Sequence, residues 1–249
     1  MSLVHNYFTN MKQVLERIER TQLDNIERAA ERIADSLENG GIWHLLDTGH
    51  MLMYEAVGRT GGMMAVRPVR VTVEVDNPTR YREEDIGKKK RVFMDEVAGL
   101  PAFIVGKSKM MPGDVLMIGS VSGINILPVE MAIYAREMGI TVIALTSVEY
   151  SGFLQPMHPG GKRLYEVCDI VLDNCSQVGD TVVQVEELGQ GLCPSSGIAA
   201  SYMMWAIQTR VVELLLARGK KPSVYVSNHM PGAAKHNSTA WANYEKEGY

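Results

Sequence analysis

The sequence has few cysteines, no long hydrophobic segment and no large excess of charge of either sign. Its 249 residues include three cysteines, Cys168, Cys175 and Cys193, an odd number without C-x-x-C spacing. This pattern favours reduced thiols over a disulfide framework or a zinc site. No apolar run reaches the roughly 18 residues of a membrane span, and the first residues lack the basic and apolar regions of a signal peptide. We therefore expect a cytoplasmic protein with no membrane partner.

The charges are nearly balanced, with 25 basic and 29 acidic residues and a formal net charge of −4. Because nucleic-acid-binding proteins usually carry clustered basic charge, we expect no nucleic-acid partner. The six histidines are scattered without the i,i+4 or H-x-E spacing of a metal site, so we expect no metal and no other cofactor. With 46% hydrophobic residues, the chain is long enough for one large α/β domain with a full core.

Strand and helix patterns alternate from residue 41 onward. Residues 11–38 have the apolar spacing of a helix, with an expected break near Thr21, and Asn39-Gly40-Gly41 ends this segment. We expect strands at residues 42–46, 69–75, 115–120, 141–146, 169–172 and 181–185. Helices are expected at residues 51–60, 101–109, 127–138 and 197–216. This alternation predicts a doubly wound parallel sheet in a three-layer α/β domain.

The same patterns divide the chain into three parts. An N-terminal helical segment covers residues 1–40, the α/β domain covers residues 41–220, and a polar C-terminal tail with aromatic residues covers residues 221–249. We expect the tail to dock on the domain. Residues 76–91 are polar and charged and are interpreted as a surface loop.

Four turns rich in small and hydroxyl-bearing residues follow predicted strands or precede helices. The most informative is Gly-Ser-Val-Ser-Gly-Ile-Asn at residues 119–125, between a buried strand and a helix. Backbone N–H groups at a helix start favour anions, and an open parallel sheet binds ligands beyond the carboxyl ends of its strands. Hydroxyl groups suit a phosphate with neighbouring sugar hydroxyls. The predicted ligand-binding residues are Thr48, Gly49, Ser120, Ser122, Gly123, Asn125, Thr146, Ser147, Ser195 and Ser196.

Residues 113–146 resemble the core of the sugar isomerase (SIS) domain family. In that family a strand leads into a Ser-x-Ser-Gly turn, a helix that ends at Gly, and an apolar strand that ends in Thr. Residues 55–59, Glu-Ala-Val-Gly-Arg, are similar to a segment of the phosphoheptose isomerase branch, and residues 194–218 resemble the family's last helix. The resemblance implies a five-stranded parallel sheet of flavodoxin-like order and a homodimer or homotetramer assembled through the N-terminal helices. It also implies a sugar phosphate as the small-molecule partner.

The resemblance implies a catalytic role for Glu55. Aldose–ketose isomerisation moves a proton between adjacent carbons through an enediol, which a positioned carboxylate can do. The family's histidine in the last helix is absent, because residues 202–216 contain none, and the first turn reads Asp-Thr-Gly-His rather than Gly-x-Gly-x-Ser. His50, His229 and His236 are the candidate general acids. The two tail histidines also fit a polar loop that caps a subunit interface.

Two alternatives stand beside the leading hypothesis of a sugar-phosphate isomerase. One is a lyase of the same fold, resembling the N-acetylmuramic acid 6-phosphate etherases, which would use the same carboxylate to remove a proton and expel an ether substituent. The other is a non-catalytic phosphosugar-sensing module, which the missing helix histidine favours.

Overall fold

Five parallel strands form the centre of the fold. The computed structural model describes residues 2–49, 51–76, 78, 80 and 92–249. Its sheet has the strand order β2-β1-β3-β4-β5, which confirms the predicted doubly wound sheet of flavodoxin-like order. The strands are β1 (Trp43–Asp47), β2 (Val66–Pro68), β3 (Val115–Gly119), β4 (Thr141–Thr146) and β5 (Ile170–Asp173).

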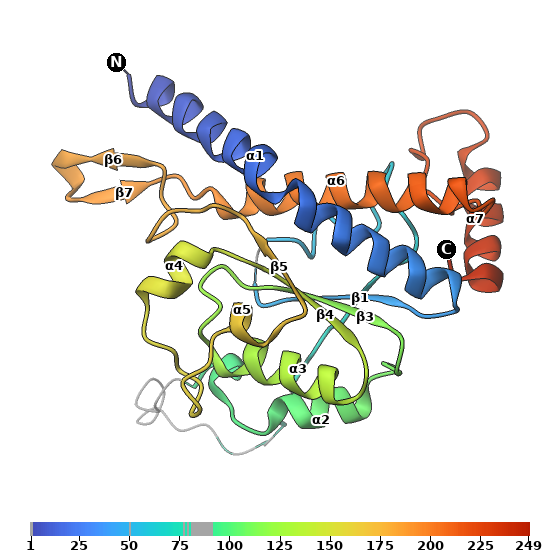
Figure 1. The fold of residues 1–249 in the computed structure, drawn as a ribbon, viewed down its shortest axis with the longest axis horizontal. Coiled ribbons are helices and arrows are strands. Elements are labelled where there is room, and N and C mark those ends of the chain that lie inside the picture. Colours follow the sequence, from blue (N-terminus) through green and yellow to red (C-terminus); the bar gives the residue numbers. More distant parts are fainter. Residues whose placement is uncertain (1, 50, 77, 79, 81–91) are drawn as a thin grey trace.

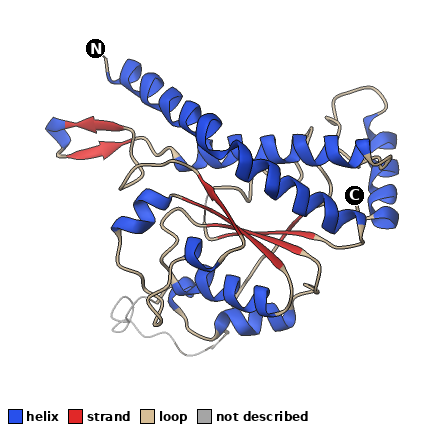
Figure 2. Cartoon of the chain, in the orientation of Figure 1, coloured by secondary structure: helices blue, strands red, loops and turns tan. Residues whose placement is uncertain are grey.

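Helices cover both faces of this sheet (Figure 1, Figure 2). One face is covered by α1 (Leu3–Glu38) and α6 (Ser196–Ala217). The other face is covered by α2 (Leu100–Lys107), α3 (Ile126–Glu137) and the short α5 (Leu164–Val167). The remaining elements are α4 (Val148–Phe153), α7 (Ala233–Glu247), the single turns η1 (Met94–Glu96) and η2 (Glu186–Leu188), and a hairpin of β6 (Val183–Val185) and β7 (Gln190–Leu192).

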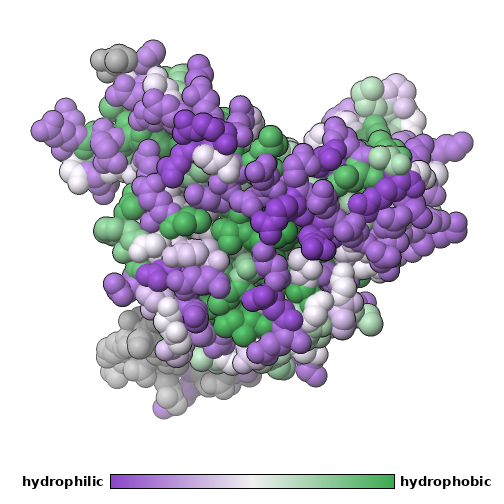
Figure 3. Space-filling view, in the orientation of Figure 1, coloured by the Kyte–Doolittle hydropathy of each residue, from purple (hydrophilic) through white to green (hydrophobic). Residues whose placement is uncertain are grey.

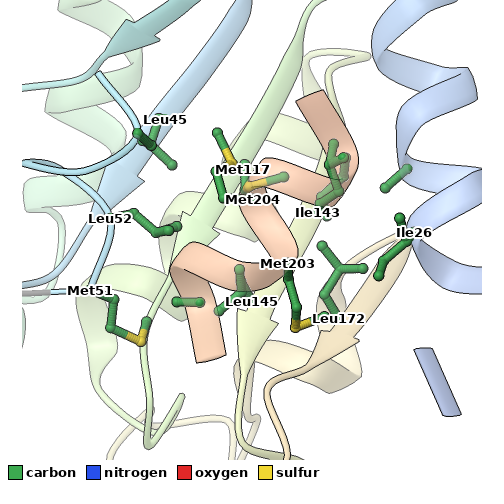
Figure 4. Packing of buried hydrophobic residues seen from close by; sticks show 14 of the residues in the cluster. Ile26, Leu45, Met51, Leu52, Met117, Ile143, Leu145, Leu172, Met203 and Met204 are labelled. Atoms are coloured by element: carbon green, nitrogen blue, oxygen red, sulfur yellow. The ribbon is translucent and has the colours of Figure 1, made fainter. Parts of the chain in front are cut away.

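The core lies on both faces of the sheet because alternate side chains of each strand point to opposite sides. Met117 and Leu145 belong to the cluster under α1 and α6, and Leu116 and Ile118 belong to the cluster under α2 and α3. Figure 4 shows Met203 and Met204 of α6 beside sheet residues such as Met117 and Leu145. Flexible thioethers fill this interface, as the methionine-rich sequence suggests.

Helix α1 runs without interruption, so the expected break near Thr21 is wrong. The Thr21 hydroxyl donates to the carbonyl of Arg17 at 2.7 Å, a bond that a threonine makes inside a helix. The first turns of α1 extend beyond the sheet in Figure 1, and Leu3 and Phe8 are exposed there. The helix therefore offers an apolar surface at its N-terminal end as well as its buried stripe.

Two elements expected near the predicted site are not present in the described residues. Residues 51–60 form turns instead of a helix, and the Asp47 carboxylate accepts hydrogen bonds from the N–H groups of Leu52 and Met53 at the start of this segment. Residues 69–75 form no strand, although the N–H of Val69 donates to Leu45 O at 2.7 Å and so continues the pairing of β2 with β1 by one residue. Val69 and Val71 pack against the cluster under α2 and α3, whereas Val73 and Val75 are 64% and 85% exposed, so only the first half of the valine alternation accompanies burial.

The tail docks through a helix, α7, that the sequence patterns did not predict. Trp241 of this helix stacks against Tyr225 and Tyr244, and the Arg67 guanidinium lies 5.2 Å from its ring centre. The C-terminal Tyr249 is buried. Most of the predicted loop at residues 76–91 lies outside the described residues. No described helix combines the length and hydropathy that a membrane crossing requires.

Candidate functional site

The turn after β3, residues 119–125 and here called the β3 turn, is fixed by its carbonyl groups. Three of its carbonyl oxygens accept hydrogen bonds from segments that follow β4. The pairs are Ser147 N to Val121 O (3.0 Å), Leu164 N to Gly123 O (2.8 Å) and Met157 N to Ile124 O (3.0 Å). In a planar trans peptide the C=O and N–H bonds point in opposite directions, so the N–H groups of the same peptide units point away from these segments. This arrangement suits an anion in front of the turn.

Gly123 is required by the backbone of the β3 turn. Its φ is +58°, and a Cβ added there would lie 2.8 Å from Thr146 Oγ1 and 3.2 Å from Ser151 Oγ. Asn125 is the N-cap residue of α3, and its side chain makes no capping hydrogen bond to that helix. Ser122 and Asn125 are partly exposed, whereas Ser120 is only 3% exposed. The side chains of Ser122 and Asn125 are therefore the ones that solvent reaches.

The turn after β1 contacts the β3 turn directly. The Thr48 hydroxyl donates to the carbonyl of Gly119 at 3.2 Å. The Asp47 carboxylate accepts from the N–H groups of Gly49, Leu52 and Met53, which fixes the path of the chain beyond the strand. Strands β1 and β3 are neighbours in the sheet, so these two turns meet where the strand order reverses.

A cavity of about 510 Å³ opens beside the turn after β1. Its walls come from residues 46–49, 53 and 54, from the segment 69–72 after β2, from Phe93 and Met94 at η1 and from Leu127 in the first turn of α3. Thr48 and Gly49 line it, and Arg70 supplies a positive charge. Its volume is in the range of small-molecule sites. This cavity and the β3 turn together form the candidate site.

Glu55 lies next to this cavity, in a neighbouring recess at the start of α6. It forms an ion pair with Arg59 at 3.3 Å, and 42% of its side-chain surface is exposed. The recess measures about 400 Å³ and is also lined by Gly197, Ile198 and Ser201. Tyr54 lines both the recess and the 510 Å³ cavity, so the two spaces adjoin. The carboxylate is therefore accessible and close to the candidate site.

Four of the predicted ligand residues are completely buried: Thr146, Ser147, Ser195 and Ser196. The Thr146 hydroxyl donates to Val121 O at 3.1 Å, and the Ser147 hydroxyl donates to Ser176 O at 2.6 Å. Both hydroxyls thus hold neighbouring turns in place. In this structure they support the β3 turn from behind.

The N-terminus of α6 is occupied by the carboxylate of Asp180. Its oxygens accept from the backbone N–H groups of Ser195 (3.1 Å) and Ser196 (3.0 Å), and from their hydroxyls at 3.2 and 2.6 Å. A negative charge at this end of a helix is favourable, so Asp180 takes the place that a bound anion would take. Sequence reasoning missed Asp180, because an aspartate after glycine is typical of an ordinary turn.

The tail histidines lie far from the β3 turn within one chain. His229 and His236 are exposed, and His236 lines a cavity with Gly219 and Lys220, just beyond the C-terminal end of α6. Figure 1 shows α7 at that end of α6. A 22-residue helix is about 33 Å long, and Ser195 and Ser196 lie at its other end. His50 lies outside the described residues, and among those described no three His, Cys, Asp or Glu side chains gather as a metal site.

The family follows from comparison of the whole sequence with known proteins. The model of the SIS domain matches residues 6–147, and the chain belongs to the SIS domain family. Within it, the sequence is 30% identical to UPF0309 protein GK1441 of Geobacillus kaustophilus over 247 residues, 98% of this chain and 95% of the relative. It is 28% identical to UPF0309 protein BH0227 of Halalkalibacterium halodurans, with coverage of 98% and 95%.

A solved structure agrees with this fold. The phosphoheptose isomerase GmhA from Neisseria gonorrhoeae superimposes with a TM-score of 0.50 at 18% identity, over 86% of this chain and 97% of that chain. At this level of identity the likeness concerns the fold alone.

Proposed function

We propose that this protein binds a phosphorylated sugar between the β3 turn and the cavity at the carboxyl end of β1. The observation that carries the proposal is the β3 turn before α3. Three of its carbonyl oxygens accept hydrogen bonds from residues that follow β4, so the N–H groups of the same peptide units point the other way. The N–H groups and the Ser122 hydroxyl would hold the phosphate, with Thr48 and Gly49 at the sugar. Arg70 in the cavity wall adds a charge of the right sign.

We further propose that the bound sugar phosphate is isomerised between aldose and ketose, with Glu55 as the base. The carboxylate would remove a proton from the carbon next to the carbonyl and return it to the neighbouring carbon of the enediol. The accessible position of Glu55 beside the candidate site supports this role, as does the name of the structural neighbour, a phosphoheptose isomerase. His50 is the proposed general acid, since it follows Thr48 and Gly49 directly in the chain.

Proton exchange with solvent tests the role of Glu55. Hexose, heptose and amino-sugar phosphates are incubated with the protein in heavy water, and deuterium at the exchanging carbon is followed by NMR. Glu55→Gln should slow exchange about 10²- to 10⁴-fold, as expected for the loss of a general base. The matched control is Glu137→Gln, an exposed glutamate at the end of α3 that should leave exchange unchanged.

Two further measurements make this test decisive. The sugar phosphate should raise the melting temperature of Glu55→Gln as much as that of the unchanged protein, because the phosphate contacts remain. Arg59→Ala removes the ion-pair partner of Glu55 and should keep most of the exchange activity. Equal exchange in the unchanged protein and in Glu55→Gln would remove Glu55 from the mechanism.

A binding function without turnover is the second candidate, and one observation favours it. His229 and His236 lie beyond the far end of α6, so within one chain they supply no acid next to Glu55. A sugar phosphate that stabilises the protein without any proton exchange would select this function. The structure offers no comparable observation for the lyase.

A further inference from the structure

A second cavity, of about 700 Å³, lies at the amino end of β1 and along β2, and no residue of the β3 turn lines it. Its walls come from the end of α1, the first residues of β1, the strand β2, the residues after α2 and the last turn of α7. Figure 1 shows the end of α1 and α7 together at this end of the molecule, and Figure 3 shows a mainly hydrophilic surface over α7. We call it the lower cavity.

Positive charge is in excess in the lower cavity. Four cationic and two acidic side chains line it, although the whole chain carries a net charge of −4. Lys246 is paired with Glu247 at 2.6 Å. The other cations, Arg67, Arg70 and Lys109, form no ion pair with any described residue. The cavity therefore attracts an anion.

Arg67 is held in place by aromatic rings. Its guanidinium carbon lies 5.2 Å from the ring centre of Trp241 and 5.5 Å from that of Tyr244. A guanidinium over an aromatic face keeps its N–H donors at its edge, where they fit the oxygen atoms of a phosphate. Helix α7 thus orients the guanidinium of Arg67, a residue of β2, so that it suits a phosphate.

His44 places a largely buried imidazole in the wall of the lower cavity. Its residue is 8% exposed, and Nε2 lies 2.9 Å from Asp114 Oδ2. The same carboxylate accepts from the N–H groups of Ile42 (2.9 Å) and Met111 (2.8 Å), which fixes the orientation of the imidazole. The other ring nitrogen, Nδ1, has no hydrogen-bond partner among the described residues. A ligand in the cavity would satisfy it.

We propose that the lower cavity binds a small phosphorylated molecule at a site separate from the β3 turn. Arg67 and Lys109 hold the phosphate, and His44 Nδ1 bonds to a neighbouring hydroxyl of the ligand. A phosphate dianion fits these contacts because the guanidinium of Arg67, held by two aromatic rings, and the ammonium group of Lys109 together complement its two charges. Val69 and Arg70 line both this cavity and the one beside the β3 turn, so a ligand here shares a wall with the proposed sugar-phosphate site.

Calorimetric titration with glycerol 1-phosphate, which carries one phosphate and two hydroxyls, tests the proposal. Low salt is used because screening weakens such contacts. Lys109→Ala should weaken binding about ten- to a hundredfold, the usual effect of losing one charge-assisted hydrogen bond. Lys109 is exposed and has no ion-pair partner among the described residues, so its removal should leave the fold intact. Lys107→Ala, two residues away and outside the cavity wall, is the matched control and should bind within twofold of the unchanged protein.

Ser122→Ala distinguishes the two proposed sites, because Ser122 belongs to the β3 turn and has no part in the lower cavity. Binding that falls with Lys109→Ala and persists with Ser122→Ala supports the lower cavity. Three results would overturn it: no binding by the unchanged protein, equal binding by Lys109→Ala, or equal losses with Lys107→Ala and Lys109→Ala. None of these results bears on proton exchange by Glu55, so the two proposals fail separately.

Discussion

The β3 turn and the turn before α6 look alike in sequence and differ in structure. Each combines serines with a glycine and leads into a helix, and both were predicted to bind a phosphate. In the turn before α6, Ser195 and Ser196 are fully buried against the carboxylate of Asp180. In the β3 turn, Ser122 is partly exposed, and the side chain of the N-cap residue Asn125 makes no capping hydrogen bond to α3. The turn before α6 thus binds an anion that the chain itself supplies, whereas the β3 turn is the one that we propose to bind an external anion.

This contrast gives the two turns different physical roles. An internal carboxylate stabilises the fold under all conditions, because the helix start is always satisfied. At the β3 turn, we propose that a bound phosphate supplies the negative charge instead. We therefore expect changes around Asp180 to act on folding, and changes in the β3 turn to act mainly on ligand affinity.

The largest effect is expected for Asp180→Ala. The change leaves two backbone N–H groups and the buried Ser196 hydroxyl without their acceptor, while the Ser195 hydroxyl keeps Ser176 Oγ, and it should lower the free energy of unfolding by about 3–5 kcal/mol. Urea unfolding followed by circular dichroism measures it. Glu187→Ala, an exposed acidic residue nearby in the chain, should stay within about 0.5 kcal/mol of the unchanged protein. A loss below about 1 kcal/mol for Asp180→Ala would contradict the structural role assigned to this carboxylate.

Gly123→Ala should have the next largest effect. Its φ of +58° disfavours alanine, and the new methyl group would lie 2.8 Å from Thr146 Oγ1. We expect a loss of about 2–3 kcal/mol in the free energy of unfolding, together with weaker binding of sugar phosphate. Gly197→Ala is the matched change at the start of α6, where a Cβ meets nothing within 4 Å. It should leave stability equal or raise it by up to about 1 kcal/mol, and a similar loss at both glycines would be evidence against this explanation.

The sheet could be predicted from the sequence because its strands carry short apolar runs at regular spacing. Strand β4 is found at the predicted residues 141–146, and β1, β3 and β5 lie within a residue or two of their predicted positions. The errors occur where local contacts override pattern. Residues 51–60 form turns whose first N–H groups bond to the Asp47 carboxylate, and of the alternating valines at 69–75 only Val69 and Val71 pack against the core. Helix α7 was missed because its apolar contacts are mostly aromatic and made with residues distant in sequence, such as Arg67.

The candidate site could be predicted only in part. The β3 turn was found because a buried strand, a serine–glycine turn and a helix start follow one another in the sequence. The burial of Ser195 and Ser196 could not be predicted, because Asp180 lies 15 residues before Ser195 and meets it only through the fold. Arg70 and Tyr54 were missed for the same reason, since tertiary structure brings them to the cavity.

Replacing one serine in each turn by alanine sharpens the comparison further. Ser122→Ala should change the free energy of unfolding by less than about 0.5 kcal/mol and weaken sugar-phosphate binding about fivefold, since one hydroxyl donor to a charged group is lost. Ser195→Ala should do the reverse: its hydroxyl bonds to Ser176 and Asp180 in the interior, so stability should fall by about 1–2 kcal/mol while affinity stays within twofold. Urea unfolding and calorimetric titration of both variants provide the four values. Equal losses of affinity in the two variants would mean that the turns share one function, and the difference drawn between an external and an internal anion would be wrong.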